Sequence, residues 1–237
     1  MLRTVISHLG KKLVFKRHLP RDFGGSPILV SPAAALSYWY RDLNRVDPFL
    51  FLMVGELVKP NSIVWDIGAN IGLFSFAAAQ VAARVIAVEP DPWLGNLLHR
   101  STELNGLPVT VVPAAVSDRC GVTTLHIADR SRASNSLDGP GQPQRVASIT
   151  LDSMLQHYPA PDILKIDVEG WEYPVLTGAA HVLRHGPVIW CEVTRNHKEI
   201  SGLLKESGYT IYAARASERK PIPRACYDTL AVCTATP

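Results

Sequence analysis

The sequence has 237 residues, of which 47% are apolar and 19% charged, enough for one sizeable α/β domain with a small N-terminal addition. The formal charge is only +3, and basic residues are interspersed with acidic ones, so the charge pattern does not predict a nucleic-acid partner. No apolar run is long enough for a membrane helix, and no signal peptide is evident. The four cysteines lack metal-binding spacing. We therefore expect a cytoplasmic protein with free thiols.

Residues 1–60 are expected to form a helical addition that precedes the main domain. Leu2 to Phe15 has the pattern of a basic amphipathic helix, which either contacts a surface or partner or packs on its own domain. Ser31, followed by proline, has the residue type of a helix cap. Tyr38 to Arg41 combine aromatic rings with polar tips, and two hypotheses apply equally: a substrate lid, or the core of the added helices. Asp47 to Val58 is predicted to be a helix.

The segment from Ile63 to Gly72 predicts a strand, a tight turn and the start of a helix that continues to Ala83. Its spacing is D-x-G-x-N-x-G, and the two glycines permit positive φ and the close approach of a ligand. Unpaired N–H groups at the helix start face that ligand. A dinucleotide fingerprint, G-x-G-x-x-G, would require glycine at Asn70. Asp66 adds a negative charge that suits a cationic ligand better than a phosphate.

The apolar run from Arg84 to Val88 is typical of a buried parallel strand. It ends at Glu89 and Pro90. In doubly wound folds a carboxylate at the tip of the second strand accepts hydrogen bonds from both ribose hydroxyl groups. Glu89 is therefore predicted to bind a nucleoside. The helix that follows is expected to begin at Asp91 to Trp93 and to end at about Asn105.

The third predicted strand, Val109 to Pro113, leads into small residues from Ala114 onward that leave room for a flat ring. Two hypotheses apply to Ser117 and Asp118: they accept a hydrogen bond from an adenine amino group, or they only turn the chain. Apolar and polar residues alternate from Gly121 to Ala128, and a polar stretch follows. This pattern predicts a hairpin with a mobile loop, inserted between the strands of the parallel sheet.

The segment from Asp162 to Glu172 predicts another buried strand, with Asp167 and Glu169 at its carboxyl end. Strand alternation places both carboxylates on one side, at the edge where ligands bind in open α/β sheets. Burying two carboxylates side by side costs free energy through desolvation and mutual repulsion, so their presence indicates a functional role. A helix from Trp171 to Leu183 and a strand from Val188 to Val193 are predicted to follow. The last two strands are expected to form an antiparallel hairpin.

Five phrases occur in this order: V-W-D-I-G-A-N-I-G, V-I-A-V-E-P, A-A-V-S-D, I-T-L-D and L-K-I-D-V-E-G-W-E-Y-P-V-L-T-G-A. Through them, residues 60–195 resemble the FkbM family of S-adenosylmethionine-dependent methyltransferases. The resemblance implies a Rossmann-like class I methyltransferase domain over residues 61–237, with a doubly wound, mostly parallel seven-stranded sheet and an antiparallel last strand. It also implies O-methylation of a hydroxyl on a sugar, polyketide or other small-molecule or glycan acceptor. Trp171 departs from the family, which usually has a small residue there, and could reshape the acceptor pocket.

The resemblance also assigns roles to residues. The positions that it implies for the cofactor are Asp66, Gly68, Asn70, Gly72, Glu89, Pro90, Ala115, Ser117, Asp118 and Asp167. Of these, the first four would hold the methionine part, Glu89 the ribose, and the segment from Ala115 to Asp118 the adenine side. Asp167, with Glu169, would lie beside the transferable methyl group.

An alcohol that attacks this methyl group loses a proton, and a base within hydrogen-bond reach accelerates the reaction by about 10² to 10⁴. The candidate bases are Asp167, Glu169, Glu192 and His197. His197 has the pKa range for the task, but a single histidine after a strand also fits a structural role. Carboxylates could instead hold a divalent metal, yet no further ligand cluster is evident and no metal site is predicted. Two alternatives stay open: an NAD-dependent oxidoreductase, which Asn70 disfavours, and a module that binds S-adenosylmethionine without turnover.

Overall fold

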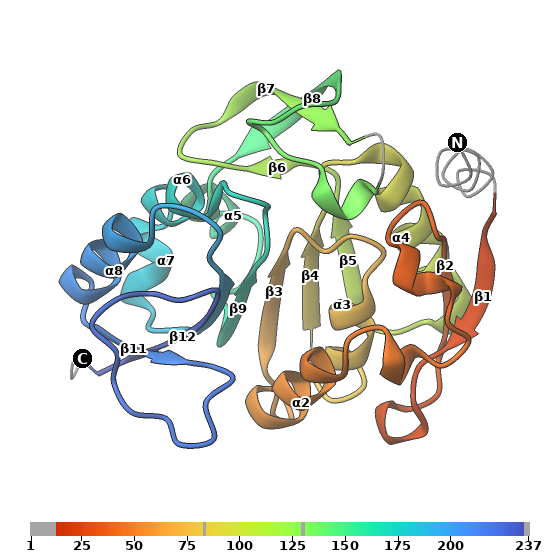
Figure 1. The fold of residues 1–237 in the computed structure, drawn as a ribbon, viewed down its shortest axis with the longest axis horizontal. Coiled ribbons are helices and arrows are strands. Elements are labelled where there is room, and N and C mark those ends of the chain that lie inside the picture. Colours follow the sequence, from red (N-terminus) through yellow and green to blue (C-terminus); the bar gives the residue numbers. More distant parts are fainter. Residues whose placement is uncertain (1–12, 83, 129–130, 235–237) are drawn as a thin grey trace.

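The centre of the fold is a seven-stranded sheet (Figure 1). The computed structural model describes residues 13–82, 84–128 and 131–234. The strands of this sheet are β3 (Ile63–Ile67), β4 (Arg84–Val88), β5 (Val109–Val112), β9 (Ile163–Ile166), β10 (Val188–Glu192), β11 (Tyr209–Ala213) and β12 (Asp228–Cys233). Their order is β11-β12-β10-β9-β3-β4-β5, and only β12 runs against its neighbours. The predicted doubly wound, mostly parallel sheet with an antiparallel last strand is confirmed.

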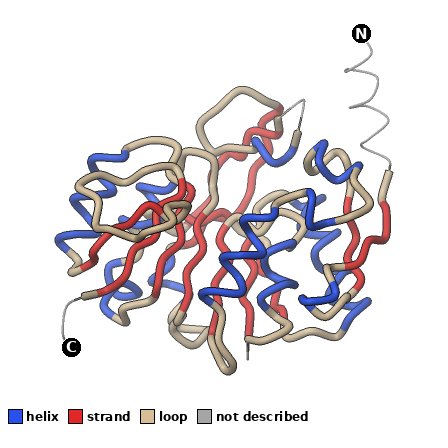
Figure 2. The backbone as a smooth tube through the Cα atoms, turned by 60° about the horizontal axis from the view of Figure 1, so that its bottom comes forward, coloured by secondary structure: helices blue, strands red, loops and turns tan. Residues whose placement is uncertain are grey.

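Helices cover both faces of the sheet (Figures 1 and 2). One face packs against α2 (Pro48–Leu57), α3 (Leu73–Ala78) and α4 (Pro92–Asn105). The other face packs against α5 (Leu151–Met154), α6 (Glu172–Thr177), α7 (Ala180–Arg184) and α8 (His197–Glu206). Val64 and Trp65, which are adjacent in β3, belong to these two opposite cores. Burial on both faces explains why the strands are continuous apolar runs in the sequence.

Polar side chains fix where several helices begin. Asp47 Oδ1 accepts a hydrogen bond from Leu50 N at 3.0 Å, and Asp91 Oδ1 accepts one from Trp93 N at 2.8 Å, so α2 and α4 start close to where they were predicted. The helix predicted from Trp171 to Leu183 is divided into α6 and α7. The division arises because the Asp152 carboxylate accepts hydrogen bonds from the backbone at the start of α7.

The helix after the glycine turn is shorter than predicted. α3 ends at Ala78, and the N–H groups of Gln80 and Val81 donate to carbonyl groups three residues back. These tighter bonds are typical of the last turn of a helix. The predicted end of this helix, Ala83, lies outside the described residues.

In the part of the N-terminal addition that the structure describes, the first elements form a hairpin, whereas a helical addition was expected. β1 (Phe15–His18) pairs antiparallel with β2 (Pro27–Val30). Leu29 N donates to Ser101 Oγ in α4 at 2.9 Å, so the hairpin is attached to the main domain. Local sequence patterns carry no signal for such a long-range contact. Residues 2–12 of the amphipathic helix predicted there lie outside the described residues, and Phe15 belongs to a strand.

Short turns connect β2 to α2. The helix predicted to start at Ser31 is replaced by a turn, in which Ser31 Oγ accepts a hydrogen bond from Ala33 N at 3.2 Å. Two 3₁₀ turns follow, η2 (Leu36–Trp39) and η3 (Leu43–Arg45). Tyr38 is buried, whereas Trp39 and Tyr40 are exposed. The aromatic segment is therefore divided between the core and the surface.

The predicted hairpin insertion forms a small second sheet. β7 (Gly121–Ile127) pairs antiparallel with β8 (Gln142–Ile149), and β6 (Ala115–Val116) pairs parallel with β8. This sheet lies beyond the carboxyl ends of β3, β4 and β5, at the top of Figure 1. In the part of the chain that the structure describes, no helix has both the length and the apolar character needed to cross a membrane.

Candidate active site

Two adjoining cavities lie over the carboxyl ends of β3, β9 and β10. The first, here called the Glu89 cavity, is lined among others by Glu89, Pro90, Leu94, Ala115, Arg132, Glu169 and Trp171. The second, the Tyr38 cavity, is lined among others by Ser37, Tyr38, Asp47, Leu50, Phe74 and Lys165. Five residues line both cavities: Gly68, Asn70, Ala133, Asp167 and Glu192. Asp167 and Glu192 thus lie at the junction of the two cavities.

The glycines of the turn after β3 pack against protein atoms. Gly68 and Gly72 have φ of 80° and 89°, and Asn70 also has a positive φ, 54°. A Cβ on Gly68 would lie 1.8 Å from the backbone oxygen of Asp167, and one on Gly72 would lie 2.1 Å from Leu98 Cδ1. The sequence indicated glycines that make room for a ligand. In the structure they make room for the neighbouring turn and for α4.

Glu89 is a buried carboxylate held by backbone donors. It is 5% exposed, and its two oxygens accept hydrogen bonds from Asn70 N and Asp91 N, each at 2.8 Å. Burial raises the pKa of Glu89 to about 8, although the two N–H groups lower it. Each carboxylate oxygen keeps a further lone pair, so the group can still accept from a ligand hydroxyl in the cavity.

A buried chain of charges connects β3 and β9. Asp66 is completely buried, and its oxygens accept hydrogen bonds from Ser75 Oγ at 2.6 Å and from Lys165 Nζ at 3.2 Å. Lys165 Nζ also lies 3.5 Å from Asp167 Oδ2. Burial lowers the pKa of Lys165, but the surrounding carboxylates raise it above its ordinary value, so the ammonium stays charged. Asp66 lines neither cavity, whereas its partner Lys165 lines the Tyr38 cavity.

Lys165 is a site residue that the sequence analysis missed. The available signal was a lysine in the otherwise apolar run I-L-K-I, one position from Ile166 and two from Asp167. A lysine is almost never fully buried unless it is paired, so its place in a predicted central strand already required acidic partners.

Three carboxylates meet where the cavities join. Burial raises the pKa of Glu169 to about 7, with Asp167 and Glu192 adding to the shift. Burial, followed by Asp167, also raises the pKa of Glu192 to about 7, and the Tyr227 hydroxyl donates to Glu192 Oε2 at 2.7 Å. β9 ends at Ile166 and Glu169 has a φ of 51°, so a turn, and not strand alternation, brings Glu169 close to Asp167. Burial and mutual repulsion therefore raise the pKa values of all three carboxyl groups.

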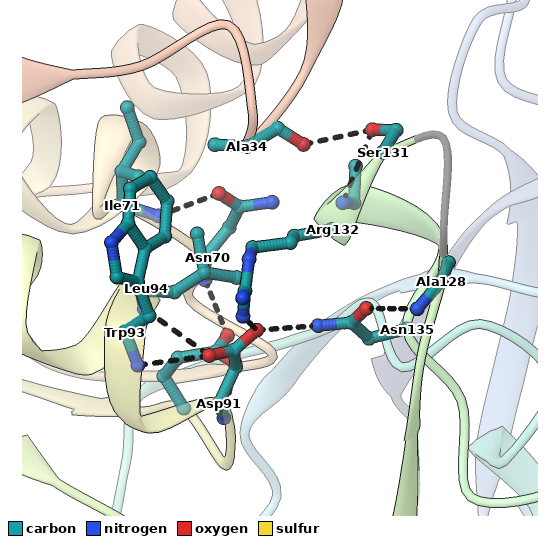
Figure 3. A network of polar contacts seen from close by, with 12 residues as sticks. Ala34, Asn70, Ile71, Asp91, Trp93, Leu94, Ala128, Ser131, Arg132 and Asn135 are labelled. Carbon is teal, nitrogen blue, oxygen red and sulfur yellow. Dashed lines mark hydrogen bonds and ion pairs between the residues drawn. The ribbon is translucent and has the colours of Figure 1, made fainter. Parts of the chain in front are cut away.

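The described part of the hairpin loop closes one wall of the Glu89 cavity (Figure 3). The Arg132 guanidinium pairs with the Asp91 carboxylate and lies 5.0 Å from the centre of the Trp93 ring. Asn135 Nδ2 donates to Asp91 Oδ2 at 2.7 Å. On the other side, Ser131 Oγ donates to the Ala34 carbonyl at 2.8 Å. The loop that the sequence analysis expected to be mobile is thus bonded both to α4 and to the segment before Tyr38.

Some predicted positions lie away from the cavities. Ala115 lines the Glu89 cavity, but Ser117 and Asp118 do not. Ser117 Oγ accepts a hydrogen bond from Trp171 Nε1 at 2.9 Å and donates to Asp118 Oδ1, also at 2.9 Å. Trp171, the departure from the family pattern, lines the Glu89 cavity and not the Tyr38 cavity.

His197 lies at the start of α8, and its Nδ1 is 3.0 Å from the Ala225 carbonyl oxygen. Neither cavity includes it. Gly72 is likewise absent from both cavity walls. Among the described residues, no three His, Cys, Asp or Glu side chains are grouped as ligands of a metal ion.

The order of the seven-stranded sheet, with parallel strands and an antiparallel last strand, is that of a Rossmann-like class I methyltransferase fold. Residues 66–211 match the methyltransferase FkbM domain, and the chain belongs to this family. S-Adenosylmethionine is the methyl donor of the class. The chain is therefore a methyltransferase, and this finding replaces the alternative of an NAD-dependent oxidoreductase.

Individual similar proteins include one from an archaeon. Hexuronic acid methyltransferase AglP of Haloferax volcanii is 28% identical over 177 residues, which cover 70% of this chain and 71% of AglP. Among solved structures, methyltransferase FkbM from Methylobacillus flagellatus is 18% identical with a TM-score of 0.47, covering 84% of this chain. This chain spans only 57% of that protein's length. Precorrin-6y C5,15-methyltransferase from Geobacter metallireducens is 13% identical with a TM-score of 0.47, and the alignment covers 77% of this chain and 85% of that one.

Proposed function

We propose that this methyltransferase uses S-adenosylmethionine to methylate a hydroxyl group of a sugar. The observation that carries the proposal is the junction of the two cavities, where Asp167 and Glu192 line both. One cavity has groups suited to a positively charged nucleoside, and the other is lined by polar side chains such as Tyr38 and Asp47. The name of AglP, a hexuronic acid methyltransferase, supports a sugar as the acceptor class. Residues 61–237 would form the methyltransferase domain, and the preceding segment a wall of the acceptor side.

The chemistry of the Glu89 cavity suits this cofactor. When bound, S-adenosylmethionine supplies an electrophilic methyl group on a positively charged sulfur, and it also carries an ammonium group. The residues that would hold it are Gly68 and Asn70 for the methionine part, Glu89 for the ribose hydroxyls, and Leu94, Ala115 and Val116 for the adenine side. Asp167 and Glu169 place negative charge in the wall. Arg132, the cation in the same wall, is already neutralised by Asp91. The cavity therefore favours a cation over a pyrophosphate.

Glu192 is the best placed base. Asp167 is occupied by Lys165, and Glu169 lines the Glu89 cavity alone. Glu192 lines both cavities, and the Tyr227 hydroxyl fixes one of its oxygens. Its pKa of about 7 matches the pH at which a general base works best. Glu192 would accept the proton of the acceptor hydroxyl, and the walls of the two cavities would hold the reacting groups in line.

The test separates cofactor binding from turnover. Calorimetry of the wild type with S-adenosylhomocysteine should show binding, and Glu89→Gln should weaken it. In assays of methyl transfer from labelled S-adenosylmethionine to a panel of methyl glycosides, Glu192→Gln should lower kcat by about 10² to 10⁴ and leave S-adenosylhomocysteine affinity unchanged. The matched control is Glu199→Gln, an exposed acid on α8, which should alter neither. Failure of the wild type to bind the product, or full activity of Glu192→Gln, contradicts the proposal.

A further inference from the structure

Tyr38 is a buried side chain with an unused hydroxyl group. It lies in η2, is only 6% exposed, and its hydroxyl has no hydrogen bond to the part of the chain that the structure describes. Two side-chain polar atoms in the described residues are both fully enclosed and unpaired, Arg17 Nε and Trp65 Nε1. The Tyr38 oxygen also has no partner among the described residues but is not one of these enclosed atoms, so part of its surface is accessible. Tyr38 lines the Tyr38 cavity. A buried hydroxyl that faces a cavity without a partner is suited to bind a polar ligand.

Asp47 adds an acceptor to the same cavity. Its Oδ1 accepts the hydrogen bond from Leu50 N that starts α2, whereas its Oδ2 accepts no hydrogen bond from the described residues. Asp47 also lines the cavity. Burial, followed by the Asp47 charge, raises the pKa of Tyr38. The phenol therefore keeps its proton and can donate, while Asp47 can only accept. Together the two side chains can satisfy two neighbouring hydroxyl groups of one ligand.

The charges of the cavity restrict that ligand further. Asp47, Asp167 and Glu192 contribute carboxylates, and Lys165 is the cation among the lining residues. Lys165 is already shared between Asp66 and Asp167. Arg215 lies outside the cavity wall, and although its charge interacts with Asp47 and Glu192, it is paired with Asp228. Neither cation is left over for an anionic ligand. Placing a further carboxylate here would bring like charges together in a partly buried site, at a cost in electrostatic energy.

We propose that the Tyr38 cavity is the acceptor subsite and that it takes an uncharged sugar through a pair of neighbouring hydroxyl groups, with Tyr38 and Asp47 as specificity-determining residues. A hexuronate would be excluded, so the acceptor differs from the one in the name of AglP. This inference rests on the proposed function and narrows its acceptor. A third hydroxyl of the same sugar ring would face Glu192 at the junction with the Glu89 cavity.

Saturation-transfer NMR on the full chain, saturated with S-adenosylhomocysteine, tests the inference. The probes are matched pairs of methyl glycosides and methyl glycosiduronates in the gluco, galacto and manno series. At least one neutral glycoside should receive saturation transfer, and its uronate partner should not. Tyr38→Phe and Asp47→Asn should each weaken binding of that neutral glycoside roughly tenfold. Asparagine still caps a helix, so Asp47→Asn should remain folded. It should also let the matching uronate bind.

Matched controls and a second measurement separate the possible failures. Tyr40→Phe and Asp42→Asn change the same residue types outside both cavities and should leave glycoside binding unchanged. S-Adenosylhomocysteine affinity, measured by calorimetry, should stay within about twofold in Tyr38→Phe, which retains the packed ring. If the wild type fails to bind S-adenosylhomocysteine, the proposed function is wrong. If it binds this product but no neutral glycoside, binds uronates equally well, or is unaffected by Tyr38→Phe, the acceptor assignment is overturned.

Discussion

Replacement of Lys165 by methionine removes the cation that lies between Asp66 and Asp167. Asp66 is completely buried and Lys165 is 5% exposed, so solvent screens this pair very little. Methionine has a similar length, and the variant leaves two carboxylates without their partner. Removal of one member of a buried ion pair costs about 3 to 5 kcal/mol. We expect the free energy of unfolding at about pH 8 to fall by this amount.

The pH dependence of this loss has a definite sign. Burial raises the pKa of Asp167 and the Lys165 charge lowers it, so removal of Lys165 should raise the folded-state pKa of Asp167 further above its value in the unfolded chain. The cost of the charged Asp167 carboxylate is absent where this group is protonated and grows as the pH rises through its folded-state pKa. The stability difference between variant and wild type should therefore be smaller at about pH 5 than at about pH 8.

Urea unfolding followed by tryptophan fluorescence measures both quantities. The control is Lys198→Met, which removes an exposed lysine on α8 and should change stability by less than about 0.5 kcal/mol at either pH. A loss below about 1 kcal/mol for Lys165→Met at pH 8, or an equal loss at the two pH values, refutes the view that this lysine neutralises buried carboxylates.

The rate of methyl transfer should rise with pH and level off above about pH 7, because Glu192 accepts a proton only as the carboxylate and its pKa is about 7. A pH profile of kcat without an inflection near neutrality excludes Glu192 as the base. Gly68→Ala places a methyl group 1.8 Å from the Asp167 carbonyl oxygen. We expect the free energy of unfolding to fall by more than the roughly 1 to 3 kcal/mol that a positive φ alone costs a residue other than glycine. Gly25→Ala is the matched control, since Gly25 has a φ of 63° and nothing within 4 Å of the added atom. Equal melting temperatures for these two glycine variants, measured by circular dichroism, would mean that the close contact has no energetic effect.

The parts of the fold that the sequence predicted are those with local or periodic signals. Strands buried on both faces are continuous apolar runs, as in Arg84 to Val88, and the helix caps Asp47 and Asp91 begin helices in the structure. Glu89 was predicted to bind the ribose because it follows the second parallel strand directly, and the structure places it in a cavity wall. The turn at Gly68 was predicted, but its packing role was not, because the atom it approaches belongs to Asp167, far along the chain.

Contacts between distant segments account for the remaining differences. Lys165 and Asp66 are 99 residues apart, and nothing near either residue in the sequence indicates the pairing. The N-terminal hairpin was not predicted, because its strands pair with each other and Leu29 bonds to Ser101, 72 residues away. Tyr38 was recognised as an aromatic residue with a polar tip. Its position in a cavity wall depends on where η2 lies against β3 and α2, which local propensity does not determine.

The loop in Figure 3 holds the N-terminal segment by its main chain, since Ser131 and Arg132 donate to the carbonyl oxygens of Ala34 and Ala33. Every amino acid carries that carbonyl group, so this anchorage makes no demand on which side chains the segment bears. Substitution of Tyr38 or Asp47 thus removes none of the hydrogen bonds between this segment and the loop. On the proposed acceptor assignment, single substitutions at Tyr38 or Asp47 would change the acceptor preference and leave these main-chain bonds in place.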